Sequence, residues 1–118
     1  MISNDKHRNL VDFLNNENNN EKLYICLESD IAGHRNYGPE WLAVTEKRII
    51  ILSVSDNGEI RKLHDIPLSS VKNAKNIPSV GLMSFCIETD SGFIKLISFT
   101  HSLNKHFAWA VENIQNLK

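Results

Sequence analysis

Few residues of this sequence combine types and spacing that could support catalysis. His64 and Asp65 are adjacent, and Cys86 could act as a nucleophile if a base stood beside it. Neither group lies in a recognisable nucleophile motif, and the carboxylates show no paired spacing typical of general acid–base chemistry. We therefore predict no catalytic residues and a protein that is not an enzyme.

The histidines and cysteines also lack a metal-binding pattern. His101 and His106 are five positions apart, whereas two imidazoles on one face of a helix stand four apart. Cys26 and Cys86 lie inside apolar runs far from each other, and the chain has no CxxC pair. We expect two free, buried thiols, no metal and no cofactor.

The basic residues suggest a different chemistry, the binding of anionic groups. Several of them could gather near one corner of the fold, namely Lys47, Arg48, Arg61, Lys62, Lys72 and Lys75. Because Glu46, Glu59 and Asp65 lie among them, the cluster is either a patch for anionic lipid or an acidic partner, or a solvated surface of mixed charge. The candidate lipid patch consists of Arg35, Lys47, Arg48, Arg61 and Lys62.

Composition limits the class of protein. The 118 residues suffice for one domain with a single core. A formal net charge of −1 is a poor match to a phosphate backbone, so we expect no nucleic-acid partner. The sequence has no apolar run of about 18 residues that could cross a bilayer, and its start does not resemble a secretory signal. We expect a cytoplasmic protein, with peripheral membrane contact as a secondary alternative.

Apolar periodicity predicts the elements that would position these groups. One apolar face over Asp5–Asn15 predicts a short amphipathic helix, and an Asn-rich linker completes an N-terminal segment of residues 1–20. Residues 21–118 are predicted to form the main domain. Its alternating segments predict seven strands: Lys22–Glu28, Glu40–Thr45, Arg48–Val54, Glu59–Ile66, Val71–Ile77, Met83–Thr89 and Phe93–Thr100.

The last segment changes to a helical period. Its apolar positions share one face: Leu103, Phe107, Ala110, Val111, Ile114 and Leu117. Ser102 is placed to cap the helix, and Trp109 lies off the apolar face, so it either flanks the core or is exposed. These elements predict a mainly β (α+β) fold. Seven antiparallel strands would form two bent sheets, or a partly open barrel, and the C-terminal helix would cap it. The N-terminal helix would be an addition to this fold.

The segment Ile49–Leu52 is apolar on both faces of its strand, although only one face can meet the barrel core. The other face is covered either by the N-terminal helix or by a partner, since exposed apolar patches usually mark interfaces. The candidate interface residues are Trp41, Ile50, Leu52, Tyr37 and Trp109.

Three stretches carry a family resemblance: the hairpin WLAVTEKRIIIL from Trp41, IPLSSV from Ile66, and DSG from Asp90. With the strand order and the C-terminal helix, they resemble bacterial pleckstrin-homology-like (PH-like) domains, including those related to the GRAM group. The resemblance covers about residues 22–118. It implies a binding or scaffolding module, often membrane-associated and not catalytic.

Phosphoinositide-binding members of that family hold lipid phosphates with several Lys and Arg in and beside the loop between the first two strands. The equivalent loop, Ser29–Glu40, offers Arg35 and His34 among carboxylates. Because neighbouring carboxylates oppose phosphate binding, we do not expect specific phosphoinositide binding.

We predict a non-catalytic binding or scaffolding module that engages a protein partner or associates with itself. One alternative is a peripheral lipid-binding module. Another is a small-ligand carrier or small enzyme that uses the barrel interior. An interior packed with Leu, Ile and Phe would argue against the last alternative, whereas a polar pocket converging on His64 or Cys86 would favour it. We expect no small-molecule substrate.

Overall fold

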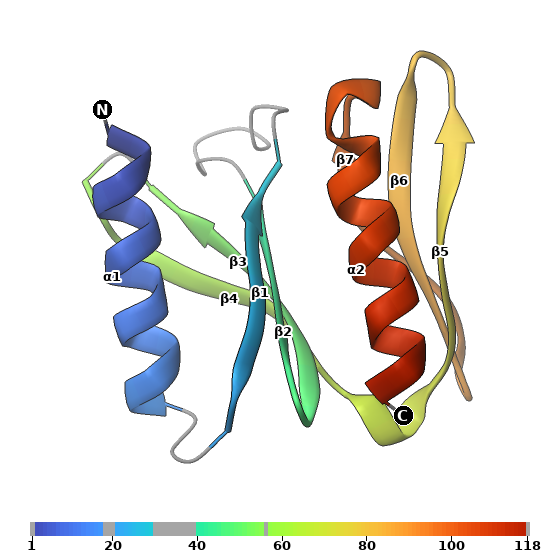
Figure 1. Ribbon diagram of the computed structural model, residues 1–118, viewed down its shortest axis with the longest axis horizontal. Coiled ribbons are helices and arrows are strands. Elements are labelled where there is room, and N and C mark those ends of the chain that lie inside the picture. Colours follow the sequence, from blue (N-terminus) through green and yellow to red (C-terminus); the bar gives the residue numbers. More distant parts are fainter. Residues whose placement is uncertain (1, 18–20, 30–39, 56, 118) are drawn as a thin grey trace.

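The computed structural model describes residues 2–17, 21–29, 40–55 and 57–117. Two antiparallel sheets and two helices make up the fold (Figure 1). The first sheet has the order β1-β2-β3-β4 and the second the order β5-β6-β7. The helices are α1 (Ile2–Glu17) and α2 (Asn104–Leu117), and the strands are β1 (Leu23–Glu28), β2 (Glu40–Thr45), β3 (Arg48–Val54), β4 (Ile60–Pro67), β5 (Val71–Ser79), β6 (Leu82–Thr89) and β7 (Gly92–Phe99).

The predicted hairpin is formed by β2 and β3, which lie at the centre of the first sheet. Val44 pairs with Ile49, so Thr45 to Arg48 make a tight corner. The Thr45 hydroxyl accepts hydrogen bonds from the backbone N–H groups of Lys47 (3.1 Å) and Arg48 (3.0 Å). Because these bonds satisfy the corner's amides, the hairpin turns without leaving buried donors unpaired.

The core fills the space between the two sheets and beneath α2. Phe85, Phe99 and Phe107 have no exposed surface, and the rings of Phe99 and Phe107 stack with centroids 4.1 Å apart. Phe107, Ala110 and Ile114 form the buried face of α2, which is the face expected from the helical period. The interior is therefore packed with apolar side chains.

Helix α1 covers the other face of the first sheet. Leu10 and Leu14 are buried there in a cluster with Trp41, Ile50 and Leu52. In Figure 1 the first sheet lies between α1 on one side and α2 with the second sheet on the other. The sequence left open whether the N-terminal helix or a partner covers this apolar face, and in the structure the N-terminal helix α1 covers it.

The seven strands and two helices are confirmed, with differences at their ends. β4 includes Pro67, and β5 runs through Pro78, beyond the expected end at Ile77. Both are edge strands, where a missing N–H need not interrupt a ladder. A 3-10 turn over His101–Leu103 contains Ser102 and leads directly into α2 at Asn104.

Candidate binding groove

The residues considered for catalysis do not converge. His64 lies on β4 and Cys86 on β6, in different sheets. Burial raises the pKa of the Cys86 thiol, although Lys95 and Lys75 oppose that shift. Among the described residues, no group of three or more His, Cys, Asp or Glu side chains could hold a metal ion. These positions give no support to a catalytic or metal site.

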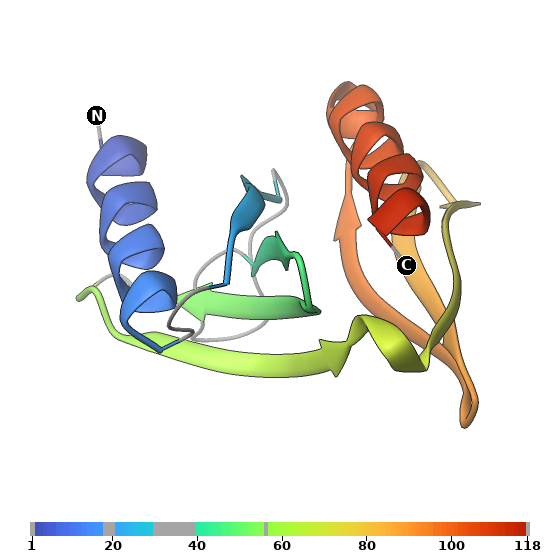
Figure 2. The same ribbon diagram turned by 60° about the horizontal axis from the view of Figure 1, so that its bottom comes forward.

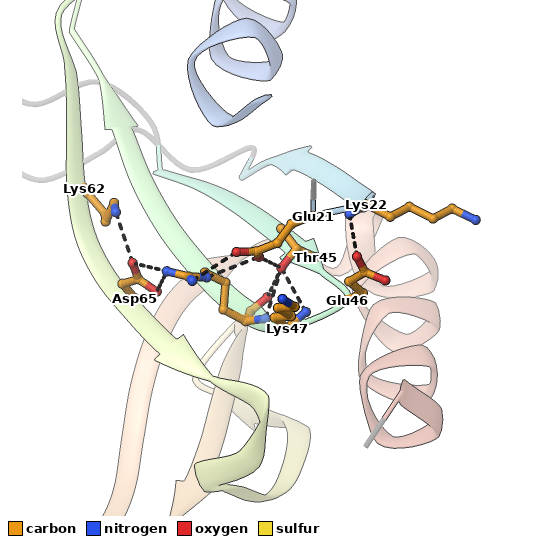
Figure 3. A network of polar contacts seen from close by, with 8 residues as sticks. Glu21, Lys22, Thr45, Glu46, Lys47, Lys62 and Asp65 are labelled. Atoms are coloured by element: carbon orange, nitrogen blue, oxygen red, sulfur yellow. Dashed lines mark hydrogen bonds and ion pairs between the residues drawn. The ribbon is translucent and has the colours of Figure 1, made fainter. Parts of the chain in front are cut away.

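A polar network occupies the place expected for the basic patch (Figure 3). Arg48 forms ion pairs with Glu21 (3.0 Å) and with Asp65 (3.1 Å), and Lys62 also pairs with Asp65 (3.0 Å). Burial lowers the pKa of Arg48, but attraction to Asp65 and Glu21 outweighs it and leaves that pKa above its ordinary value. The charges of Arg48 and Lys62 are thus compensated within the chain.

The other described members of the candidate lipid patch lie at the surface. Lys47 is exposed at the hairpin corner, and Arg61 is exposed on β4. Arg35 lies outside the described residues. The structure therefore brings Arg48 and Lys62 together, but around a carboxylate and not around an open anion site.

The candidate interface residues fall into two groups. Trp41 is 3% exposed, and Ile50 and Leu52 are fully buried beneath α1. Tyr37 lies outside the described residues. Trp109 is 52% exposed on α2. Of the four described candidates, Trp109 alone lies at the surface, where a partner could reach it without moving α1.

Trp109 lines a groove of about 430 Å³ between β1 and α2. One wall is formed by the consecutive residues Tyr24–Leu27, and the other by Lys105, His106 and Trp109. Successive side chains of a strand point to opposite faces, so a hollow on one face would be lined by every second residue. A groove lined by four consecutive residues must follow the edge of β1.

The groove combines aromatic surface with positive charge. Tyr24 is 40% exposed, and the Nζ atom of Lys22 lies 4.9 Å from the centre of its ring. Lys105 and His106 are exposed on the opposite wall. Burial raises the pKa of the Cys26 thiol to about 12, so this group is neutral at ordinary pH and a poor nucleophile. The arrangement is suited to binding and not to covalent chemistry.

A second hollow, of about 540 Å³, lies where the hairpin corner meets the end of α2. It is lined by Glu46, Lys47, Leu68, Ser69 and Leu117. It has no aromatic side chain, and its two charged residues have opposite signs. We regard the groove beside β1 as the stronger candidate, because exposed aromatics are enriched where proteins bind one another.

The sequence pattern did not identify Tyr24, Lys105 or His106 as site residues. Two signals were present: Trp109 lies off the apolar face of its helix, and Tyr24 lies on the strand face opposite Ile25 and Leu27. What could not be read from either pattern was that β1 and α2, far apart in the chain, share one groove.

Comparison with known proteins identifies the family. A search of curated proteins finds no match to this chain. The family described as "Bacterial PH domain" matches residues 18–116, which span β1 to β7 and nearly all of α2. The two sheets and the C-terminal helix agree with the PH-like fold, and PH-like domains commonly act as non-catalytic binding modules. The chain belongs to the bacterial PH domain family.

Proposed function

We propose that this chain is a non-catalytic module that binds a protein partner through the groove between β1 and α2. The observation that carries the proposal is Trp109, a large aromatic side chain left 52% exposed beside Tyr24 in a groove of about 430 Å³. Burying such a side chain in an interface removes a large apolar area from water. Residues 21–118 would form the binding domain, and residues 1–20 would serve as its cover.

Two features make the alternative functions less suitable. The space between the sheets is filled by Phe85, Phe99 and Phe107, which argues against a small-ligand carrier. Arg48 and Lys62 are paired with carboxylates, which weakens the case for a lipid-headgroup patch.

Neither described helix combines the length and apolar character needed to cross a membrane.

The experiment compares two aromatic residues that are equally exposed. Trp109 and Phe93 are both 52% exposed, but Phe93 lies on β7, away from the groove. Proteins captured from an extract of the native host by the full chain would be purified and titrated against wild type, Trp109→Ala and Phe93→Ala. We expect Trp109→Ala to weaken binding by about thirtyfold, as for an interface hot spot, and Phe93→Ala to leave it unchanged.

Self-association is tested in the same series. If the partner is a second copy of the chain, light scattering will give a dimer mass for wild type and Phe93→Ala and a monomer mass for Trp109→Ala. Equal affinities for wild type and Trp109→Ala, toward every captured protein and toward a second copy, would overturn the proposed function.

A further inference from the structure

Among the described strands, β1 is hydrogen-bonded along one side only. It pairs with β2, and no other described strand is bonded to its opposite edge. An edge strand presents backbone N–H and C=O groups that can pair with an added strand. The groove follows this edge, so an occupant would lie against backbone groups as well as side chains.

The register shows which backbone groups face the groove. The Ser29 N–H donates to the Glu40 carbonyl (2.9 Å), and the pairing continues without a shift to Ile25 opposite Val44. In an antiparallel ladder, bonded and non-bonded pairs alternate. Ile25 and Leu27 therefore direct their backbone groups toward β2, while the N–H and C=O of Cys26 point to the open edge.

Helix α2 forms the wall of the groove opposite β1, and it runs in the opposite direction to that strand (Figure 1). Helix α2 contributes Lys105 and Trp109 to the groove. The Lys22 ammonium lies over the Tyr24 ring, at the start of β1. An occupant would thus meet a backbone ladder, two aromatic rings and two lysines. Charge complementarity favours acidic side chains in the ligand.

We propose that the groove binds an extended peptide segment of the partner, which adds to β1 as a further strand. Its apolar side chain packs on Trp109, and its acidic side chains face Lys105 and Lys22. The Cys26 N–H and C=O supply the central backbone pair. This inference rests on the proposed function, since it specifies how the same groove holds its protein partner.

The probe is a set of 12-residue peptides selected from a random displayed library on the immobilised full chain. We expect the selected peptides to share acidic residues around one large apolar residue. Their affinity should fall at least about tenfold in Trp109→Ala and be unchanged in Phe93→Ala. Failure to select any peptide that depends on Trp109 would overturn the inference and count against the proposed function as well.

Backbone pairing has its own readout in amide hydrogen exchange followed by NMR. In the free chain we expect the Cys26 amide to exchange rapidly and the Leu27 amide, which faces β2, slowly. Saturating peptide should slow exchange at Cys26 by at least about tenfold and leave Leu27 unchanged. Peptide that binds through Trp109 without protecting Cys26 would overturn strand addition while leaving the proposed function intact.

A matched pair of charge reversals tests the acidic ligand. Lys105 lines the groove, whereas Lys95 is exposed on β7 away from it. We expect Lys105→Glu to weaken peptide binding about fivefold and Lys95→Glu to change it little. Both variants alter exposed side chains and should fold. Equal effects of the two reversals would overturn the assignment of Lys105 as the acid-binding group.

Discussion

The two sheets present outer faces of opposite character. In the first sheet, the central strands carry Trp41, Ile50 and Leu52 outward, and α1 buries all three. In the second sheet, the central strand β6 carries Cys86 outward between Lys75 and Lys95. No described helix lies on that face (Figure 2).

The difference shows what decides whether a sheet needs a second layer. A cluster of large apolar side chains on an outer face needs another element to remove it from water, whereas the single ring of Phe93 on the second sheet stays 52% exposed. A small side chain such as Cys86 can be shielded by its neighbours, because lysine stems lie along the sheet while their ammonium groups reach solvent. The Lys75 side chain extends along this face to Phe93, and its Nζ atom lies 4.7 Å from the centre of the Phe93 ring.

Removing the cover of the first sheet should have the largest effect. Deletion of residues 1–20 exposes Trp41, Ile50 and Leu52 and removes the buried Leu10 and Leu14, a loss on the order of 5 kcal/mol. We expect increased self-association or lower solubility, measured by light scattering at matched concentration. A full-length chain with Asp12→Ala, an exposed change on α1, serves as the control. A truncated chain with the mass distribution of the full chain would contradict the covering role of α1.

The next largest effect is expected inside the core that both sheets share. Phe107→Ala removes a fully buried ring that stacks on Phe99, and should lower the free energy of unfolding by about 3–5 kcal/mol. Phe93→Ala removes a ring that is 52% exposed, and should cost about 0.5 kcal/mol or less. Urea denaturation measures both. Near-wild-type stability of Phe107→Ala would mean that α2 does not close the core.

A smaller effect is expected at the hairpin corner of the first sheet. Thr45 is 1% exposed, and Thr45→Val removes the acceptor for the Lys47 and Arg48 amides while keeping a β-branched side chain. We expect a loss of about 1–3 kcal/mol in the free energy of unfolding. Ser70→Ala removes one exposed hydrogen bond to the Pro67 carbonyl and is the control, at about 0.5 kcal/mol or less. Equal losses would show that the Thr45 hydroxyl does not support the corner.

The smallest effect is expected with phosphoinositide vesicles. Because Glu21 and Asp65 compensate Arg48 and Lys62, the wild-type chain should not pellet selectively with phosphoinositide-containing liposomes at physiological salt. Liposomes of matched charge without phosphoinositide are the reference. Strong pelleting that depends on the headgroup would refute this expectation and restore the lipid-binding alternative.

Local patterns predicted most of the fold. The β2–β3 hairpin and the buried face of α2 follow from alternation and helical period, which depend on residues close in sequence. The ends of the elements were less predictable, since the 3-10 turn over His101–Leu103 that precedes α2 depends on how the chain leaves β7.

The site was harder to predict because it depends on long-range packing. Trp109 was named as an interface candidate, but its groove with Tyr24 requires knowing that α2 lies beside the edge of β1. The basic patch was assembled from charged residues between Arg35 and Lys75, and their order in the sequence did not show which of them pair. Glu21, which pairs with Arg48, lies beside the linker and carried no local signal of that contact.

The central claim is that the edge between the first sheet and α2, and not the outer face of the second sheet, is the binding surface. The most direct test is the ratio of dissociation constants for the purified partner between Trp109→Ala and Phe93→Ala, two variants that remove equally exposed rings. We predict a ratio of about thirty. A ratio near one, or a larger loss in Phe93→Ala, would contradict the account.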